Sequence, residues 1–243
     1  MRIDVFALQK KLNIPVLYFD KIDSTNLYCK SRVKEGLPFR GLVIASAQTN
    51  GQGRLGKSFY SPEESGLYLT YSLKNQTFKT KNITAAIAIS VCRSLEKTYK
   101  VSCGLKWVND IYMHNRKVGG ILCQTVDDYL LIGIGINLIR PKFIPKELEN
   151  RLGWVLDEKD VIDPSDLILT LYDEINRVFQ TFDHDLIDEY RNRCVHIGSE
   201  VEIDQNQEQF RGKCVGIDDS FHLLIEINNE VKTFSSGYMI LGI

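Results

Sequence analysis

A glycine-rich stretch at residues 51–58 concentrates the side chains best suited to binding an anion. Its sequence is GQGRLGKS, with three glycines, two cations and one hydroxyl. Glycine lets a backbone approach a ligand closely, and consecutive free N–H groups in such a turn attract negative charge. Arg54 and Lys57 add full positive charges. The stretch is therefore predicted to hold a phosphate or a carboxylate group.

The same residues match the pattern G-x-x-x-x-G-K-S of P-loop nucleotide triphosphatases, which needs a strand before it and a helix after it. Residues 41–47 are apolar and β-branched and predict the strand. Residues 59–66 are rich in turn formers, and residues 67–73 alternate like a half-buried strand. Without a helix N-terminus the phosphate cradle cannot form. A P-loop enzyme, which would hydrolyse the γ-phosphate, is the less favoured alternative.

Four other segments in the first 140 residues place polar side chains at expected strand ends or turns. Their sequences are DSTN at 23–26, KWVND at 106–110, RKVGGIL at 116–122 and GIGIN at 133–137, and Gln48 ends the strand before the glycine-rich stretch. Hydroxyl and amide groups suit an uncharged polar ligand in a mostly apolar pocket. A carboxylate suits a magnesium ion bound to phosphates. Two glycines inside a β-branched strand indicate close approach of a ligand or of another backbone.

Each motif taken alone also has a purely structural interpretation. Ser24 and its neighbours would cap a helix, and Lys117 would be a solvated turn lysine. Asn109 and Asp110 would be turn residues at a strand end. Trp154 would belong to the core. No single motif therefore defines the function.

In this order, however, the motifs closely resemble those of the biotin–protein ligase (biotin–acetyl-CoA-carboxylase ligase) family. The resemblance covers most of the chain, including its C-terminal segment. It implies that the carboxylate of biotin attacks the α-phosphorus of ATP, giving biotinyl-5′-adenylate and pyrophosphate. A lysine of a biotin carboxyl carrier protein then attacks the adenylate and releases AMP. The resemblance also implies magnesium.

The resemblance assigns two residues to catalysis. Lys117 would bridge the biotin carboxylate and the α-phosphate, and Arg54 would contact the same groups. Such a reaction depends mainly on positioning and on stabilising the charge that builds at the phosphate. The residues implied for biotin are Ser24, Thr25, Asn26, Gln48, Gly51, Gly53, Arg54, Leu55, Lys117 and Gly120. Those implied for the nucleotide are Arg54, Lys57, Phe59, Asn109, Asp110, Lys117, Asn137 and Trp154, with Asp110 also a ligand of Mg²⁺.

One position departs from the family pattern. Val108 stands where proline is frequent, which frees the backbone and adds a donor. This departure bears on the rigidity of the Asn109–Asp110 pair rather than on its identity.

Periodicity predicts an α+β fold that can present these motifs. Expected helices cover residues 1–12, 24–34, 82–98, 163–182 and 184–193, and expected strands cover 16–19, 41–48, 66–73, 101–107, 111–113, 117–126 and 130–137. Short strands at 201–203, 209–217, 222–227 and 231–234 follow. The resemblance implies that these elements form a mixed sheet backed by helices, the class II synthetase-like catalytic domain (residues 1–194), followed by a small SH3-like β-barrel (residues 195–243).

Composition excludes several other classes of protein. The net charge of −1 creates no field that would attract nucleic acid or an anionic membrane. Six scattered cysteines have no C-x-x-C spacing, and four histidines lie apart, so neither predicts a metal cluster. There is no signal peptide or membrane-spanning run. A cytoplasmic protein is expected.

Two further alternatives stay open. A lipoate or octanoate ligase or transferase shares the core fold but handles a long acyl chain. A non-enzymatic binder or repressor would bind DNA. The chain begins too close to Asp23 for the winged-helix domain of longer family members, so the resemblance is to the short form, and no specific DNA binding is expected. The expected partner is the carrier domain of acetyl-CoA or pyruvate carboxylase, and a homodimer is left open.

Overall fold

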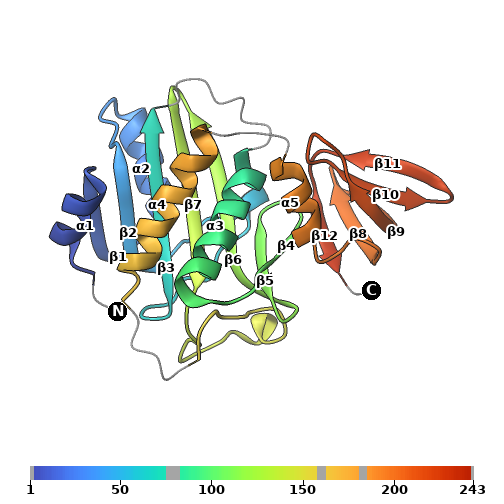
Figure 1. The fold of residues 1–243 in the computed structure, drawn as a ribbon, viewed down its shortest axis with the longest axis horizontal. Coiled ribbons are helices and arrows are strands. Elements are labelled where there is room, and N and C mark those ends of the chain that lie inside the picture. The colour runs from blue at the N-terminus through green and yellow to red at the C-terminus, as the bar shows by residue number, and fades with distance from the viewer. Residues whose placement is uncertain (1–2, 75–82, 158–162, 181–184, 242–243) are drawn as a thin grey trace.

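The computed structural model describes residues 3–74, 83–157, 163–180 and 185–241, which form one seven-stranded and one five-stranded sheet (Figure 1). The elements in chain order are α1 (Val5–Leu12), β1 (Val16–Ile22), α2 (Thr25–Lys34), β2 (Gly41–Gln48), the 3₁₀ turn η1 (Arg54–Gly56), β3 (Gly66–Lys74), α3 (Ile83–Tyr99), β4 (Gly104–Lys106), β5 (Asp110–Met113), β6 (Arg116–Val126), β7 (Tyr129–Asn137), η3 (Lys146–Leu148), α4 (Ser165–Gln180), α5 (Asp185–Arg193), β8 (Glu200–Gln205), β9 (Glu208–Ile217), β10 (Leu223–Ile227), β11 (Glu230–Phe234) and β12 (Tyr238–Leu241). The predicted α+β class is confirmed.

The large sheet has the strand order β1-β2-β3-β7-β6-β5-β4, in which only β1 and β2 are parallel neighbours. The continuously apolar strand β7 lies at its centre, as predicted. The element that follows the glycine-rich stretch is β3, preceded only by the single turn η1. The helix that a P-loop requires is therefore absent.

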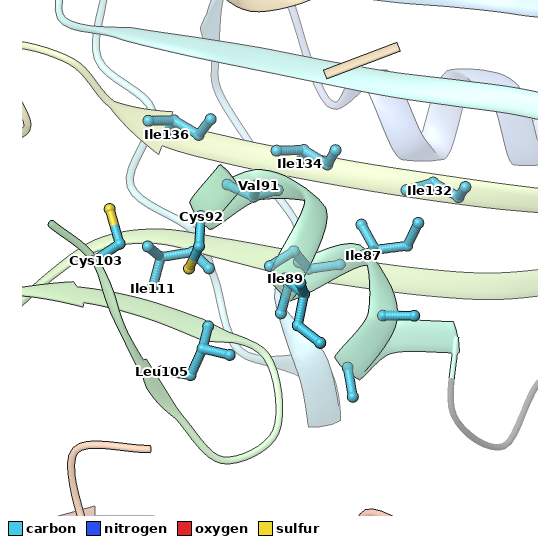
Figure 2. Packing of buried hydrophobic residues seen from close by; sticks show 14 of the residues in the cluster. Ile87, Ile89, Val91, Cys92, Cys103, Leu105, Ile111, Ile132, Ile134 and Ile136 are labelled. Carbon is cyan, nitrogen blue, oxygen red and sulfur yellow. The ribbon is translucent and has the colours of Figure 1, made fainter. Parts of the chain in front are cut away.

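Helices cover both faces of this sheet, because alternate residues of its strands point to opposite sides. Leu131 of β7 packs with Cys29 of α2 on one face. Its neighbour Ile132 belongs to the larger core on the other face, where α3 and α4 lie side by side (Figure 1). Figure 2 shows the isoleucines of β7 facing α3, with Ile87 next to Ile132 and Val91 next to Ile134. This two-sided core fixes the sheet that carries the site.

Ion pairs link the helices of the larger core to each other. Glu174 of α4 is buried (3% exposed) and lies 3.7 Å from Arg93 of α3, which also pairs with Glu189 of α5. Arg193, at the end of α5, pairs with Glu96 of α3 at 2.6 Å. The end of α5, from which the chain enters the small sheet, is therefore held against α3.

The C-terminal residues form an antiparallel sheet with the order β11-β10-β9-β8-β12. Strand β12 was not predicted, because its four residues follow a Ser-Ser-Gly turn and are too few to show a period. It pairs with β8. The indole of Trp107 donates to Phe221 O (2.8 Å), and Val195 N donates to Leu105 O (3.0 Å), so the small sheet is joined to the β4 side of the large one. We keep the boundary at residues 194 and 195 as a proposal.

The strand expected at residues 101–107 and the cysteines can also be compared with the structure. The strand expected at 101–107 is shorter, because only residues 104–106 pair with β5. Among the described residues all six cysteines are free; Cys92 and Cys103 are buried, whereas Cys123 is partly exposed. No helix among the described residues is long and apolar enough to cross a membrane.

Candidate active site

A single cavity of about 1330 Å³, here called the cleft, opens where the start of α2, the glycine-rich loop and strands β5 to β7 meet. Residues of the segment 145–152 and of strand β12 complete its lining. Every residue predicted to bind biotin or nucleotide lines the cleft except Trp154. Motifs that are far apart in the sequence are thus brought together.

One part of the cleft, here called the neutral group, consists of Ser24, Thr25, Asn26 and Gln48. The hydroxyl of Ser24 caps α2, a role that the sequence predicted for Ser24 or one of its neighbours. Gln48 Oε1 accepts bonds from Thr25 N (2.9 Å) and Thr25 Oγ1 (3.3 Å), while Gln48 Nε2 donates to Ser61 Oγ (2.9 Å). These side chains are therefore fixed before any ligand binds.

Asn26 is the exception in the neutral group. Its side chain is 4% exposed, and among the described residues neither its nitrogen nor its oxygen has a hydrogen-bond partner. Gly133 of β7 leaves room for it, since a Cβ there would lie 3.2 Å from Asn26 Nδ2. A buried polar group without a partner costs about 1–3 kcal/mol. The amide is therefore expected to find its partner in a bound molecule.

The glycine-rich loop is closed by its own backbone. Gly53 N donates to Lys57 O (2.7 Å), and Phe59 N donates to Gly51 O (2.8 Å). Glycine is required at position 51, because a Cβ would lie 2.4 Å from Phe59 O. Leu55 at the tip has a φ of +54° and is 66% exposed. It therefore lies at the rim of the cleft.

A second part of the cleft, here called the charged group, consists of Arg54, Asp110 and Lys117. Lys117 Nζ lies 2.7 Å from Asp110 Oδ1, and Arg54 Nη1 donates to Asn109 Oδ1 at 3.2 Å. Burial lowers the pKa of the Arg54 guanidinium, and the negative charge of Asp110 opposes this shift. Neighbouring residues of the KWVND motif thus hold both cations that were predicted to be catalytic.

Although Val108 stands where the family often has proline, the Asn109 end of the KWVND motif is held in a fixed position. The Trp107–Val108 peptide is cis. Asn109 Nδ2 donates to Ile121 O (3.0 Å), and Asn109 O accepts from Ile121 N (2.9 Å). Strand β6 therefore fixes Asn109 by its side chain and by its backbone.

The glycines of β6 and β7 allow two close approaches. A Cβ on Gly119 would lie 2.9 Å from Gly135 O, which is the approach of another backbone that the sequence predicted. A Cβ on Gly135 would lie 2.5 Å from the ring of Phe59, and one on Gly120 would lie 3.3 Å from the same ring and from Lys117 Cε. Phe59 therefore lies over the Gly120–Gly135 pair, on a surface without side chains.

Asn137 lies where β7 ends beside the cleft. Its side chain is buried, and Nδ2 donates to Gly153 O (3.0 Å) and to Lys117 O (3.4 Å). Gly153 N in turn donates to Lys117 O (2.8 Å). Asn137 therefore fastens the segment around Gly153 to the start of β6.

Trp154 lies outside the cleft. It lines a separate cavity of about 690 Å³ together with Arg116 and Arg140. The guanidinium carbon of Arg140 is 5.5 Å from the centre of the Trp154 ring. The structure thus brings together all the predicted nucleotide residues but this one.

The lining residues that were not predicted as site residues include Lys106 and Tyr238. Lys106 begins the KWVND motif and is 7% exposed, and burial lowers its pKa to about 8, a shift that Asp110 opposes. Tyr238 belongs to β12, and Lys57 Nζ lies 2.8 Å from the centre of its ring. Lys106 could have been found from its motif. Tyr238 could not, because strand β12 was not predicted.

Comparison with known proteins defines first the class and then the family. A model described as "Biotin/lipoate A/B protein ligase family" matches residues 18–137, which places the large sheet among ligases of these two acids. A model described as "Biotin protein ligase C terminal domain" matches residues 196–242. Together the two matches show that the chain belongs to the biotin protein ligase family.

Individual relatives agree over most of the chain. The bifunctional ligase/repressor BirA of Bacillus subtilis is 29% identical over 93% of this chain and 74% of its own length. The biotin–[acetyl-CoA-carboxylase] ligase of Mycobacterium tuberculosis is 25% identical over 89% of this chain and 85% of its own. The Aquifex aeolicus biotin protein ligase, solved in complex with biotin and ATP, has a TM-score of 0.80 and 26% identity, covering 93% of this chain and 99% of that one.

Proposed function

We propose that this ligase attaches biotin to a lysine of a biotin carboxyl carrier protein through a biotinyl-5′-adenylate made from biotin and ATP. One observation carries the proposal: the amide of Asn26, which has no hydrogen-bond partner among the described residues, lines the same cleft as the cations Lys117 and Arg54. Biotin has a neutral polar head and an acid group that must meet a nucleotide phosphate. A neutral group and a charged group in one cleft suit the two ends of that molecule.

In the first step, the charged group would act on the phosphate. The carboxylate of biotin forms a bond to the α-phosphorus of ATP, and pyrophosphate leaves with the electron pair of the broken P–O bond. Negative charge builds on the α-phosphate oxygens. Lys117 is fixed by Asp110, so its ammonium would stabilise this charge without first being reoriented. Arg54 would hold the adenylate, with the backbone of the glycine-rich loop closing over it.

Magnesium would enter with the nucleotide. Asp110 is the carboxylate of the charged group, and among the described residues no three His, Cys, Asp or Glu side chains gather at one place. Mg²⁺ is commonly held by one or two carboxylates together with substrate phosphates and waters. Asp110 fits this use, in which the ion accompanies ATP, better than it fits a resident metal.

Several finer statements belong to the same proposal. The carrier would be the biotinyl domain of acetyl-CoA or pyruvate carboxylase. The net charge of −1 supports the view that the chain does not bind DNA specifically. We also propose that the protein works in the cytoplasm, and we leave open whether it forms a homodimer.

The test is a reconstituted reaction with biotin, ATP labelled at the α-phosphate and a purified carrier domain. Biotin-dependent adenylate should form first and biotinylated carrier should follow. The same assay with lipoate tests the alternative acid, and lipoate should give neither adenylate nor a shift in melting temperature. If labelled adenylate does not depend on biotin, or if lipoate is preferred, the proposed function is wrong.

A further inference from the structure

Strand β12 of the small sheet contributes an aromatic ring to the cleft. Tyr238 lines the cleft together with its neighbours Gly237 and Met239. Two ammonium groups, one from the glycine-rich loop and one from the large sheet, lie near its ring. Lys57 Nζ, from the glycine-rich loop, is 2.8 Å from the ring centre, and Lys106 Nζ, from β4, is 5.5 Å from it.

The position of this ring is fixed from the small sheet. Gly237, just before it, has a φ of +146°, and a Cβ there would lie 2.7 Å from Ile203 Cδ1 of β8. Tyr238 itself pairs with Asp204 of β8. The small sheet is in turn joined to the large one through the bond from Trp107 to Phe221. The ring is thus carried by a framework that is independent of the glycine-rich loop.

Lys57, in contrast, has little else to hold its side chain. The residue is exposed, and within the described part of the chain its ammonium forms no ion pair. The face of an aromatic ring attracts a cation, more strongly when water is excluded. The contact with Tyr238 is therefore the interaction that sets where the Lys57 ammonium lies relative to the cleft.

We propose that Tyr238 is a positioning residue for the first step, holding Lys57 at the cleft so that its charge meets the phosphates of the nucleotide. The small sheet would then take part in adenylate formation itself, before any carrier protein arrives. This inference rests on the proposed function. It adds that the position of the Lys57 ammonium depends on an aromatic ring that lies about 180 residues further along the chain.

The experiment measures biotin-dependent exchange of pyrophosphate into ATP by the full chain, without carrier protein, at saturating biotin. Tyr238→Leu should raise the KM for ATP about two- to fivefold, as expected for loss of an exposed cation–π contact. Tyr238→Phe, which keeps the ring, should leave that KM unchanged. A fluorinated phenylalanine at position 238, which keeps the shape but weakens the negative face of the ring, should raise it.

A double-mutant cycle separates positioning from simple destabilisation. In the Lys57→Met background, Tyr238→Leu should have no further effect on the KM for ATP. Phe210→Leu is the matched control, because Lys232 Nζ lies 5.3 Å from the Phe210 ring in the same small sheet but outside the cleft. This variant should not change the KM for ATP.

Three results would overturn the inference: additive effects of Tyr238→Leu and Lys57→Met, equal effects of Tyr238→Leu and Phe210→Leu, or an unchanged KM with both Tyr238→Leu and the fluorinated ring. If Tyr238→Leu does not fold, the fluorinated ring and Tyr238→Phe still decide the matter. Failure of the proposed function gives a different result, because the unmodified chain would then show no biotin-dependent exchange.

Discussion

The neutral and charged groups of the cleft differ in how their polar atoms are satisfied. In the neutral group, Thr25 and Gln48 hydrogen-bond each other, and the amide of Asn26 has no partner within the described parts of the chain. In the charged group, Lys117 already pairs with Asp110. A ligand therefore adds a missing bond in the first group but must share an existing ion pair in the second. Binding and chemistry are expected to be separable by mutation.

The largest effect should come from breaking the charged group. Lys117→Ala is expected to slow adenylate formation about 10³-fold, since removing one preorganised group that stabilises transition-state charge typically costs 10²–10³ in rate. The dissociation constant of biotin should change less than about threefold, because the lysine matters most when the phosphate gains charge. Rapid-quench measurement of adenylate together with calorimetry of biotin binding checks both values. An unchanged rate of adenylate formation would refute the role of Lys117.

The next effect should come from the neutral group. Asn26→Ala is expected to weaken biotin binding by about one to two orders of magnitude, which corresponds to the 1–3 kcal/mol of a buried hydrogen-bonding group. The stability of the ligand-free protein should fall little, because the amide loses no hydrogen bond to any residue that the structure describes. Ser72→Ala is the matched control, since Ser72 Oγ is also buried and unpartnered among the described residues but lies outside the cleft. Equal biotin affinity in both variants would show that Asn26 does not contact biotin.

A smaller effect is expected at Arg54, which connects the glycine-rich loop to the charged group. Arg54→Gly should speed release of the adenylate about tenfold, since a hydrogen bond to a charged group is worth about 1.5–3 kcal/mol and Asn109 offers only a neutral partner. Release is followed by labelling of bystander proteins and by the half-life of adenylate on the enzyme. Retention as long as in the unmodified chain would contradict this role.

The smallest effect should come from the Gly120–Gly135 pair, over which the ring of Phe59 lies. Gly135→Ala puts a Cβ 2.5 Å from that ring, so the ring must move, and we expect the KM for ATP to rise about threefold, a change of about 0.7 kcal/mol. Gly216→Ala in β9 is the control, because the nearest atom to its Cβ is 4.0 Å away. Steady-state kinetics of the two variants provide the comparison. An equal KM in both would show that the position of Phe59 does not influence the nucleotide.

The parts that the sequence predicted well are those determined by local chemistry. Strand β7 was placed at the centre because it is apolar on both faces, and α2 was placed by its Ser24 cap. The motifs at 23–26, 106–110 and 116–122 were found because each combines turn residues with polar groups. The resemblance to one family then predicted that these motifs bind biotin and a nucleotide in one site.

The parts that escaped prediction depend on distant contacts. Strand β12 exists because β8 offers it a partner, and its four residues carry no period of their own. The position of Tyr238 follows from that pairing. Trp154 lies beside Arg140 in a second cavity, next to the backbone bonds that tie Gly153 to Lys117, and its role at the nucleotide stays a prediction. None of these contacts can be read from the neighbouring residues.

A structure of the chain with a non-hydrolysable biotinyl-adenylate analogue would decide whether the neutral and charged groups act on one molecule. We predict that the ureido head bonds to the Asn26 amide while the phosphate lies between Lys117 and Arg54. An analogue bound elsewhere, or bound with the Asn26 amide still unpartnered and Lys117 out of reach of the phosphate, would contradict the account.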